Sequence, residues 1–137
     1  MLILIAYALA FLIFAAIDAT WLSSVGAKLY RETLGDILDP NIRFGPAIAF
    51  YLLYPIGLVI FAVHPALKTG SPGSAIVSGA LFGFFAYATY DLSNFATLRN
   101  WTLGITLIDL AYGAIASAIV AGLVSVLAPM VARWFGG

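Results

Sequence analysis

The chain has 137 residues, of which 64% are hydrophobic and 9% are charged, and its formal net charge is zero. Soluble domains carry about 25% charged residues, so this composition excludes an ordinary soluble domain and indicates an integral membrane protein. Zero net charge gives no basis for binding nucleic acid. The absence of cysteine excludes disulfides and thiolate chemistry. At this length we expect one domain, residues 1–137, in contact with the lipid bilayer.

Four apolar segments are long enough to cross a membrane as helices, which takes about 20 residues. They cover residues 2–24, 44–64, 74–98 and 102–131. Between the first two, apolar residues from Leu29 to Leu38 recur at helical spacing opposite a charged face, and Pro40 follows. This pattern predicts a short amphipathic helix at the membrane interface, with an irregular loop as the alternative because Gly35 weakens the helix. The predicted fold class is an all-α membrane protein, a four-helix bundle with one interfacial helix.

The basic residues predict the orientation of these helices. One side of the membrane carries the first and third connections, with Lys28, Arg31, Arg43 and Arg99, and the other side carries Lys68 and Arg133. Basic connections tend to remain in the cytoplasm. We therefore expect a multi-pass protein with its first and third connections in the cytoplasm and both termini outside.

Three aspartates, Asp18, Asp91 and Asp109, lie within the predicted membrane helices, where acids are rare and usually functional. Asp18 and Asp91 each precede the end of a helix by about six residues, and Asp109 follows a start by about seven, so at roughly 1.5 Å per residue all three lie about 10 Å below one face. This shared depth predicts one polar site near that face of the membrane.

Helical spacing predicts the neighbours of these acids. Trp21 lies on the same helix face as Asp18, and Tyr87 and Asn94 lie on the same face as Asp91. Thr106 and Tyr112 lie on the same face as Asp109. Together with the three acids, these are the candidate residues for binding a proton, a cation or a solute. Three further residues near the same face are candidates for the mouth of the site: Arg43, Arg99 and Trp101. Trp21 and Trp101 also fit the alternative role of aromatic anchors at the interface, and Tyr51 and Tyr54 fit simple packing.

Small residues predict that the third and fourth helices approach closely. Gly79 and Gly83 on one helix fall opposite Gly113 and Ser117 on the other, and such residues let membrane helices touch. Asp91 should then face Asp109. Two carboxylates in a low-dielectric site cannot both stay charged, so the pair should hold a proton, a cation or an arginine. The alternative is that protonated aspartates only hydrogen-bond the helices together.

Motifs for resident cofactors are not found. The sequence has one histidine, no cysteine, no HExxH motif and no glycine-rich phosphate loop, so zinc and haem sites lack ligands. We therefore assign no metal site, and the sequence leaves the identity of any other cofactor open. Oxygen ligands from the three acids and Asn94 would suit only a hard cation.

Four stretches carry a resemblance: D-A-T-W-L (18–22), F-Y-L-L-Y (50–54), Y-A-T-Y-D-L-S-N-F-A-T-L-R-N-W (87–101) and D-L-A-Y-G (109–113). Together they resemble a family of small four-helix bacterial inner-membrane proteins of unknown function, whose signature is Y-D-L-[ST]-N-x-A-T-L. The resemblance covers nearly the whole chain, implies an inner-membrane location, and adds Tyr90 to the candidate residues. The last motif more often reads D-x-x-W-G in such proteins, and Tyr112 departs from it while keeping an aromatic hydrogen-bond donor.

Two functional classes fit this pattern, with an accessory subunit as a third. In the first, a small transporter-like protein binds or translocates a proton or cation together with a small polar solute. A four-helix monomer has little room for a pathway, so this class implies a homo-oligomer. In the second, a membrane-embedded enzyme acts on a lipid or isoprenoid with an aspartate as general acid or base. The third is a non-catalytic subunit of a larger membrane assembly. Carboxylates without a basic partner favour the first class.

Overall fold

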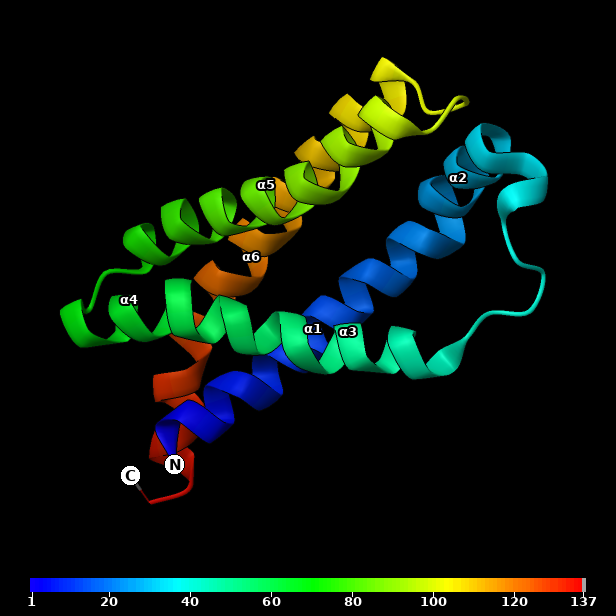
Figure 1. Cartoon of the computed structure of the whole chain (residues 1–137). Coiled ribbons are helices and arrows are strands. Elements are labelled where there is room, and N and C mark those ends of the chain that lie inside the picture. The colour runs from blue at the N-terminus through cyan, green and yellow to red at the C-terminus, as the bar shows by residue number, and fades with distance from the viewer. Residues whose placement is uncertain (137) are drawn as a thin grey trace.

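The computed structural model describes residues 1–136, and helices account for nearly all of that part of the chain (Figure 1). They are α1 (Leu2–Trp21), α2 (Ala27–Leu34), α3 (Phe44–Leu58), α4 (His64–Thr69), α5 (Pro72–Thr97) and α6 (Leu103–Trp134). They form four apolar spans of membrane-crossing length: Leu2–Ile37, Phe44–Thr69, Pro72–Thr97 and Leu103–Trp134. The predicted all-α fold with four transmembrane helices is confirmed.

The first span continues beyond its predicted end. A π-helical turn, Leu22–Gly26, joins α1 to α2, and the N–H of Ala27 donates to the carbonyl of Leu22, five residues earlier. A π-turn inserts one residue without breaking the helix. The predicted amphipathic helix is therefore present as α2, but it continues α1 instead of lying apart in the interface. It is held there because Leu34 packs with Trp101 and Ile105 at the start of α6.

The second span also contains a π-helical turn. Pro55 lies inside α3, and a second π-helical turn, Val59–Val63, joins α3 to α4. The N–H of His64 donates to the carbonyl of Val59, immediately before Pro65, which has no N–H to continue the helix. The span ends at Gly70, whose positive φ of 68° is readily adopted by glycine.

The antiparallel pair α5 and α6 makes the closest helix contact in the fold, as the small residues predicted. A Cβ atom added to Gly83 would lie 2.2 Å from the carbonyl oxygen of Gly113, and one added to Gly79 would lie 2.7 Å from that of Ser117. Only glycine fits at such distances. Figure 1 shows α5 crossing directly over α6. This contact brings Asp91 on α5 opposite Asp109 on α6.

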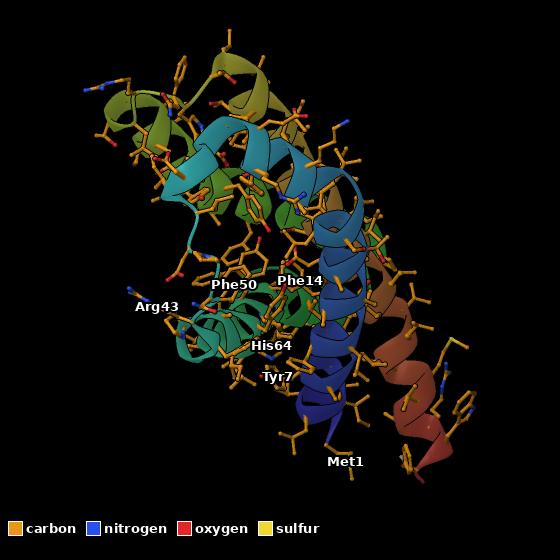
Figure 2. The ribbon with its side chains drawn as sticks, turned by 90° about the vertical axis from the view of Figure 1, so that its right-hand side faces the viewer. Met1, Tyr7, Phe14, Arg43, Phe50 and His64 are labelled. Atoms are coloured by element: carbon orange, nitrogen blue, oxygen red, sulfur yellow. The ribbon has the colours of Figure 1, made fainter. Side chains whose placement is uncertain are left out.

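The packed core occupies the end of the bundle that contains the two termini. Small residues of α1, Ala6 and Ala10, and of α6, Val124 and Ala128, are fully buried there. Toward the opposite end the helices separate, and aromatic side chains fill the space. Figure 2 shows Phe14 and Phe50 between α1 and α3, with Arg43 at the outer end of α3.

Candidate functional site

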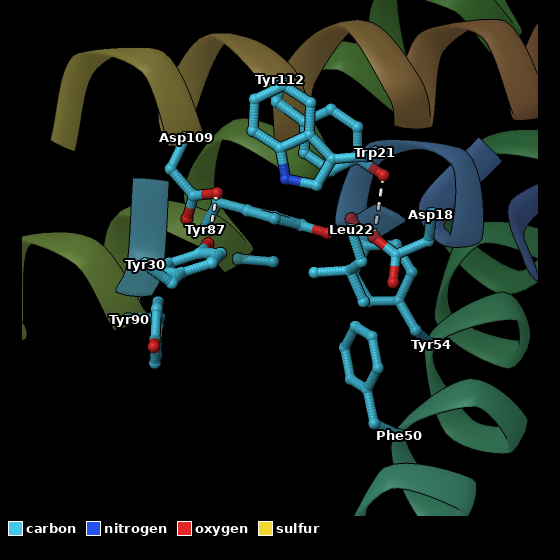
Figure 3. Close-up of a pocket in the computed structure, with 11 residues that line it drawn as sticks. Asp18, Trp21, Leu22, Tyr30, Phe50, Tyr54, Tyr87, Tyr90, Asp109 and Tyr112 are labelled. Atoms are coloured by element: carbon cyan, nitrogen blue, oxygen red, sulfur yellow. Dashed lines mark hydrogen bonds between the residues drawn. The ribbon is translucent and has the colours of Figure 1, made fainter. Parts of the chain in front are cut away.

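A cavity of about 410 Å³ lies where α1, α2, α3, α5 and α6 come together (Figure 3). Asp18 and Asp109 line it with Leu22 and Ala86, and its other seven lining residues are aromatic: Trp21, Tyr30, Phe50, Tyr54, Tyr87, Tyr90 and Tyr112. Cavities of about 300–1,000 Å³ with apolar walls and few polar groups are typical of small-molecule sites.

Asp18 is held by hydroxyl groups from two other helices. The hydroxyl of Tyr112 on α6 donates to its Oδ1 at 2.7 Å, and the hydroxyl of Tyr51 on α3 donates to its Oδ2. Asp18 is 6% exposed. Because both oxygens accept a hydrogen bond, this arrangement suits an ionised carboxylate. Asp18 therefore ties α1, α3 and α6 together beside the cavity.

Trp21 stacks on Tyr112, with ring centroids 4.3 Å apart and planes 11° from parallel. The glycine at the end of the first π-turn makes room for it, because a Cβ atom on Gly26 would lie 2.6 Å from Nε1 of Trp21. Trp21 thus lies against the cavity and orients the tyrosine that donates to Asp18. The π-turn, a feature often found at functional sites, contributes directly to this site.

Asp91 and Asp109 form a second group on the α5–α6 interface. The hydroxyl of Tyr30, from α2, donates to Oδ1 of Asp109 at 2.6 Å. Oδ2 of Asp109 and both oxygens of Asp91 are buried and have no hydrogen-bond partner among residues 1–136. The two carboxyl groups are close enough to interact. Asp91 is 0% exposed and is not among the lining residues, whereas Asp109 lines the cavity.

The structure brings together only some of the predicted site residues. Trp21, Tyr87, Tyr90 and Tyr112 line the cavity with Asp18 and Asp109. Thr106 is not among the lining residues, and its hydroxyl accepts the indole N–H of Trp101 at 3.0 Å. Trp101 is buried in a cluster with Leu34 and Ile105.

The remaining candidates lie outside the cavity lining. Asn94 is partly buried on α5, one turn beyond Asp91. Arg43 and Arg99 are exposed, and Arg43 borders a separate surface hollow with Asp36 and Asp39. Counting depth along the sequence could not show the direction in which these long side chains point.

Several site residues were missed from the sequence: Leu22, Tyr30, Phe50, Tyr54 and Ala86 in the lining, and Tyr51 behind Asp18. Tyr51 and Tyr54 were interpreted as packing, yet the hydroxyl of Tyr54 hydrogen-bonds Ser117 at 2.7 Å. The signal was the hydroxyl group itself, because a buried tyrosine O–H usually finds a partner.

The three acids do not form one ligand set for a metal. Within residues 1–136, no three aspartate, glutamate, histidine or cysteine side chains lie close enough to hold a metal ion. The predicted single constellation is divided into Asp18 with its two tyrosine donors and the Asp91–Asp109 pair with one.

A comparison with known families supports the membrane assignment. A family model described as "Predicted membrane protein (DUF2177)" matches residues 3–126. The chain belongs to this family. The resemblance to a membrane family of unknown function is therefore confirmed. No curated protein and no solved structure matches the chain.

Proposed function

We propose that this integral membrane protein binds a small organic cation in the cavity and carries it across the membrane in exchange for protons. The composition of the cavity lining supports this proposal. Two buried aspartates lie among aromatic rings, and no lysine or arginine is among the lining residues. A buried carboxylate without a cation is unfavourable. An organic cation would neutralise that charge and still match the apolar walls.

The aromatic rings favour an organic cation over a metal ion. The faces of Trp21 and the cavity tyrosines carry negative quadrupole charge, which attracts ammonium groups by about 0.5–2 kcal/mol each. Figure 3 shows Asp109 and Asp18 on either side of the stacked Trp21 and Tyr112. A cation between them would contact a carboxylate and several rings at once. An anion would meet two carboxylates and is disfavoured.

Location and assembly are part of the same proposal. We place the protein in the bacterial inner membrane with the cavity near the cytoplasmic face, as the basic connections predict. Ala6, Ala10, Val124 and Ala128 close the packed end of the bundle. A route to the other face therefore requires α1 and α6 to separate or a second copy to contribute, which favours a homo-oligomer.

Calorimetry on the protein in nanodiscs tests this proposal with choline and its uncharged carbon isostere, dimethylbutanol. We expect choline or a small tetraalkylammonium ion to bind and dimethylbutanol to bind at least about tenfold more weakly, a difference of 1.4 kcal/mol. Asp109→Asn should remove this preference. Asp39→Asn, at an exposed aspartate, is the matched control. Equal affinity for the charged and neutral probes would exclude cation recognition.

An enzyme acting on a lipid or isoprenoid is the second candidate. Leu22, Phe50 and Tyr90 line the cavity and are also exposed on the apolar surface, so a lipid chain could reach Asp109 from the bilayer. Asp109 would then act as general acid or base. Incubation with a lipid extract followed by mass spectrometry distinguishes the two: a product that requires Asp109 supports the enzyme.

A further inference from the structure

The Asp91 carboxyl is a fully buried polar group without a partner in the part of the chain that the structure describes. It is 0% exposed, and neither oxygen has a hydrogen-bond partner among residues 1–136. Its neighbour Asp109 is 1% exposed and uses only Oδ1, which accepts from Tyr30. Three buried carboxyl oxygens on two adjacent side chains thus lack a donor. Native proteins rarely leave buried polar atoms unpaired, so these oxygens indicate a further group that binds to them.

The surrounding side chains do not supply that group in this structure. The titratable groups facing the pair are Tyr30 from α2, Tyr87 and Tyr90 from α5, Tyr112 from α6 and, across the cavity, Asp18 from α1. None of these is a cation. The hydroxyls of Tyr30 and Tyr112 already donate to Asp109 and Asp18.

A metal ion is also a poor candidate. The pair offers two carboxyl groups, and no third acid or histidine within residues 1–136 completes a metal-binding group. A proton needs only two oxygens. It converts one carboxyl into a donor for the other, which removes the like-charge repulsion and pairs two of the three oxygens.

We infer that Asp91 and Asp109 share one proton, and that this pair is a proton site joined to the solute cavity through Asp109. Asp109 is the member through which the proton enters and leaves, because it lines the cavity and Asp91 does not. Tyr30 is a positioning residue, since its hydroxyl fixes Oδ1 of Asp109. That leaves Oδ2, the free oxygen of Asp109, for the proton shared with Asp91.

The pair also gives the cation exchange a mechanism, and this step rests on the proposed function. When a cation reaches Asp109, its charge favours the ionised form. The O–H bond of the pair then breaks and the proton passes to water through the cavity. One proton leaves for each monovalent cation that enters, so the net charge of the site is unchanged.

Infrared spectroscopy in a detergent without carbonyl groups tests the shared proton. We expect wild-type protein near neutral pH to show the C=O stretch of a protonated carboxyl, shifted by deuterium oxide. Labelling aspartate isotopically at its side-chain carboxyl carbon should move the band to lower frequency. This experiment needs no variant, so it cannot fail through misfolding. Absence of the band would overturn the inference.

Variants assign the band to the pair. Asp91→Asn should abolish it, whereas Asp18→Asn and the exposed Asp36→Asn should retain it. Tyr30→Phe should shift its frequency without abolishing it, because Oδ1 of Asp109 loses its donor. A band that survives in Asp91→Asn would overturn the assignment, and an unchanged frequency in Tyr30→Phe would remove Tyr30 from the site.

Adding choline separates this inference from the proposed function. Loss of the band on cation binding supports one-for-one exchange. A band that stays unchanged while choline binds would overturn the exchange. A band in protein that binds no organic cation would overturn the proposed function and support the proton pair alone.

Discussion

Asp18 and Asp91 are both buried in the helical bundle, yet Asp18 accepts a hydrogen bond at each carboxyl oxygen and Asp91 accepts none. The donors to Asp18 come from α3 and α6, which are distant from it in sequence. The neighbour of Asp91 is another acid, Asp109. The comparison teaches that the depth of an acid does not define its role. The donors around it decide whether it is held as a carboxylate or requires a proton.

This difference implies opposite responses to the same substitution. Asparagine has nearly the shape of aspartate but only one accepting oxygen and cannot ionise. At Asp18 the new amide group would face a tyrosine hydroxyl that previously donated. At Asp91 the amide group could donate to Asp109 as the shared proton does. Replacement should therefore cost stability at Asp18 and protonation at Asp91.

The largest effect is expected where the α5–α6 contact that creates the pair is disrupted. Gly83→Leu would drive a side chain into the backbone of Gly113, whose carbonyl oxygen lies 2.2 Å from the position of a Cβ atom. We expect a loss of about 3 kcal/mol in unfolding free energy, measured by thermal melting in detergent. Gly45→Leu, at a site with no atom within 4 Å, is the matched control. Equal melting temperatures for the two variants would contradict the close contact.

The comparison itself is tested by Asp18→Asn and Asp91→Asn measured side by side. Asp18→Asn should lower the unfolding free energy by about 2 kcal/mol, because a hydrogen bond to a charged group is lost. Asp91→Asn should change it by less than about 0.5 kcal/mol, since the new amide group donates to Asp109 in place of the shared proton. The melting curves of both variants provide the check. Reversed magnitudes would mean that Asp91, and not Asp18, holds the helices together.

Tyr51→Phe and Tyr112→Phe test how much each hydroxyl donor to Asp18 contributes to stability. Each removes one hydroxyl donor to the carboxylate and should cost about 1.5 kcal/mol. The sequence suggested simple packing for Tyr51, which would not predict the loss of a hydrogen bond in Tyr51→Phe. Because both donors share one acceptor, the double variant should not show the sum of the single losses. Strict additivity in thermal melting would indicate that the two hydroxyls act independently.

The sequence predicted the parts of this structure that depend on local composition. Long apolar runs were sufficient for the four spans, and glycine spacing was sufficient for the approach of Gly83 to Gly113. The positions of Asp91 and Asp109 followed because a tight turn fixes the register of α5 and α6. Contacts between helices separated by longer connections did not follow. The donation from Tyr51 to Asp18 depends on how α3 crosses α1, and no local pattern encodes that crossing.

The first π-turn explains why Tyr30 was missed. Each residue turns an α-helix by about 100°, so the residue inserted at Leu22–Gly26 rotates α2 relative to a straight continuation of α1. Tyr30 belongs to the stretch from Leu29 to Leu38 that was predicted as an amphipathic helix at the membrane interface and not as part of the site. The rotation and the packing of Leu34 on Trp101 direct it to Asp109 instead.

A small effect on stability is expected from Gly26→Ala, which alters only the Asp18 side of the cavity. The added methyl group would lie 2.6 Å from Nε1 of Trp21, a side-chain atom that can move, so we expect a loss of less than about 1 kcal/mol. The indole should nevertheless leave its stack on Tyr112. Near-ultraviolet circular dichroism would report this as a changed aromatic signal. Gly104→Ala, whose nearest neighbouring atom is an ordinary 3.7 Å away, should leave the spectrum unchanged.

The infrared band of the Asp91–Asp109 pair should persist in Gly26→Ala, because the two regions have separate donors. If the band disappeared together with the stacking signal, the two regions would be one coupled site, and the distinction between Asp18 and Asp91 would not hold.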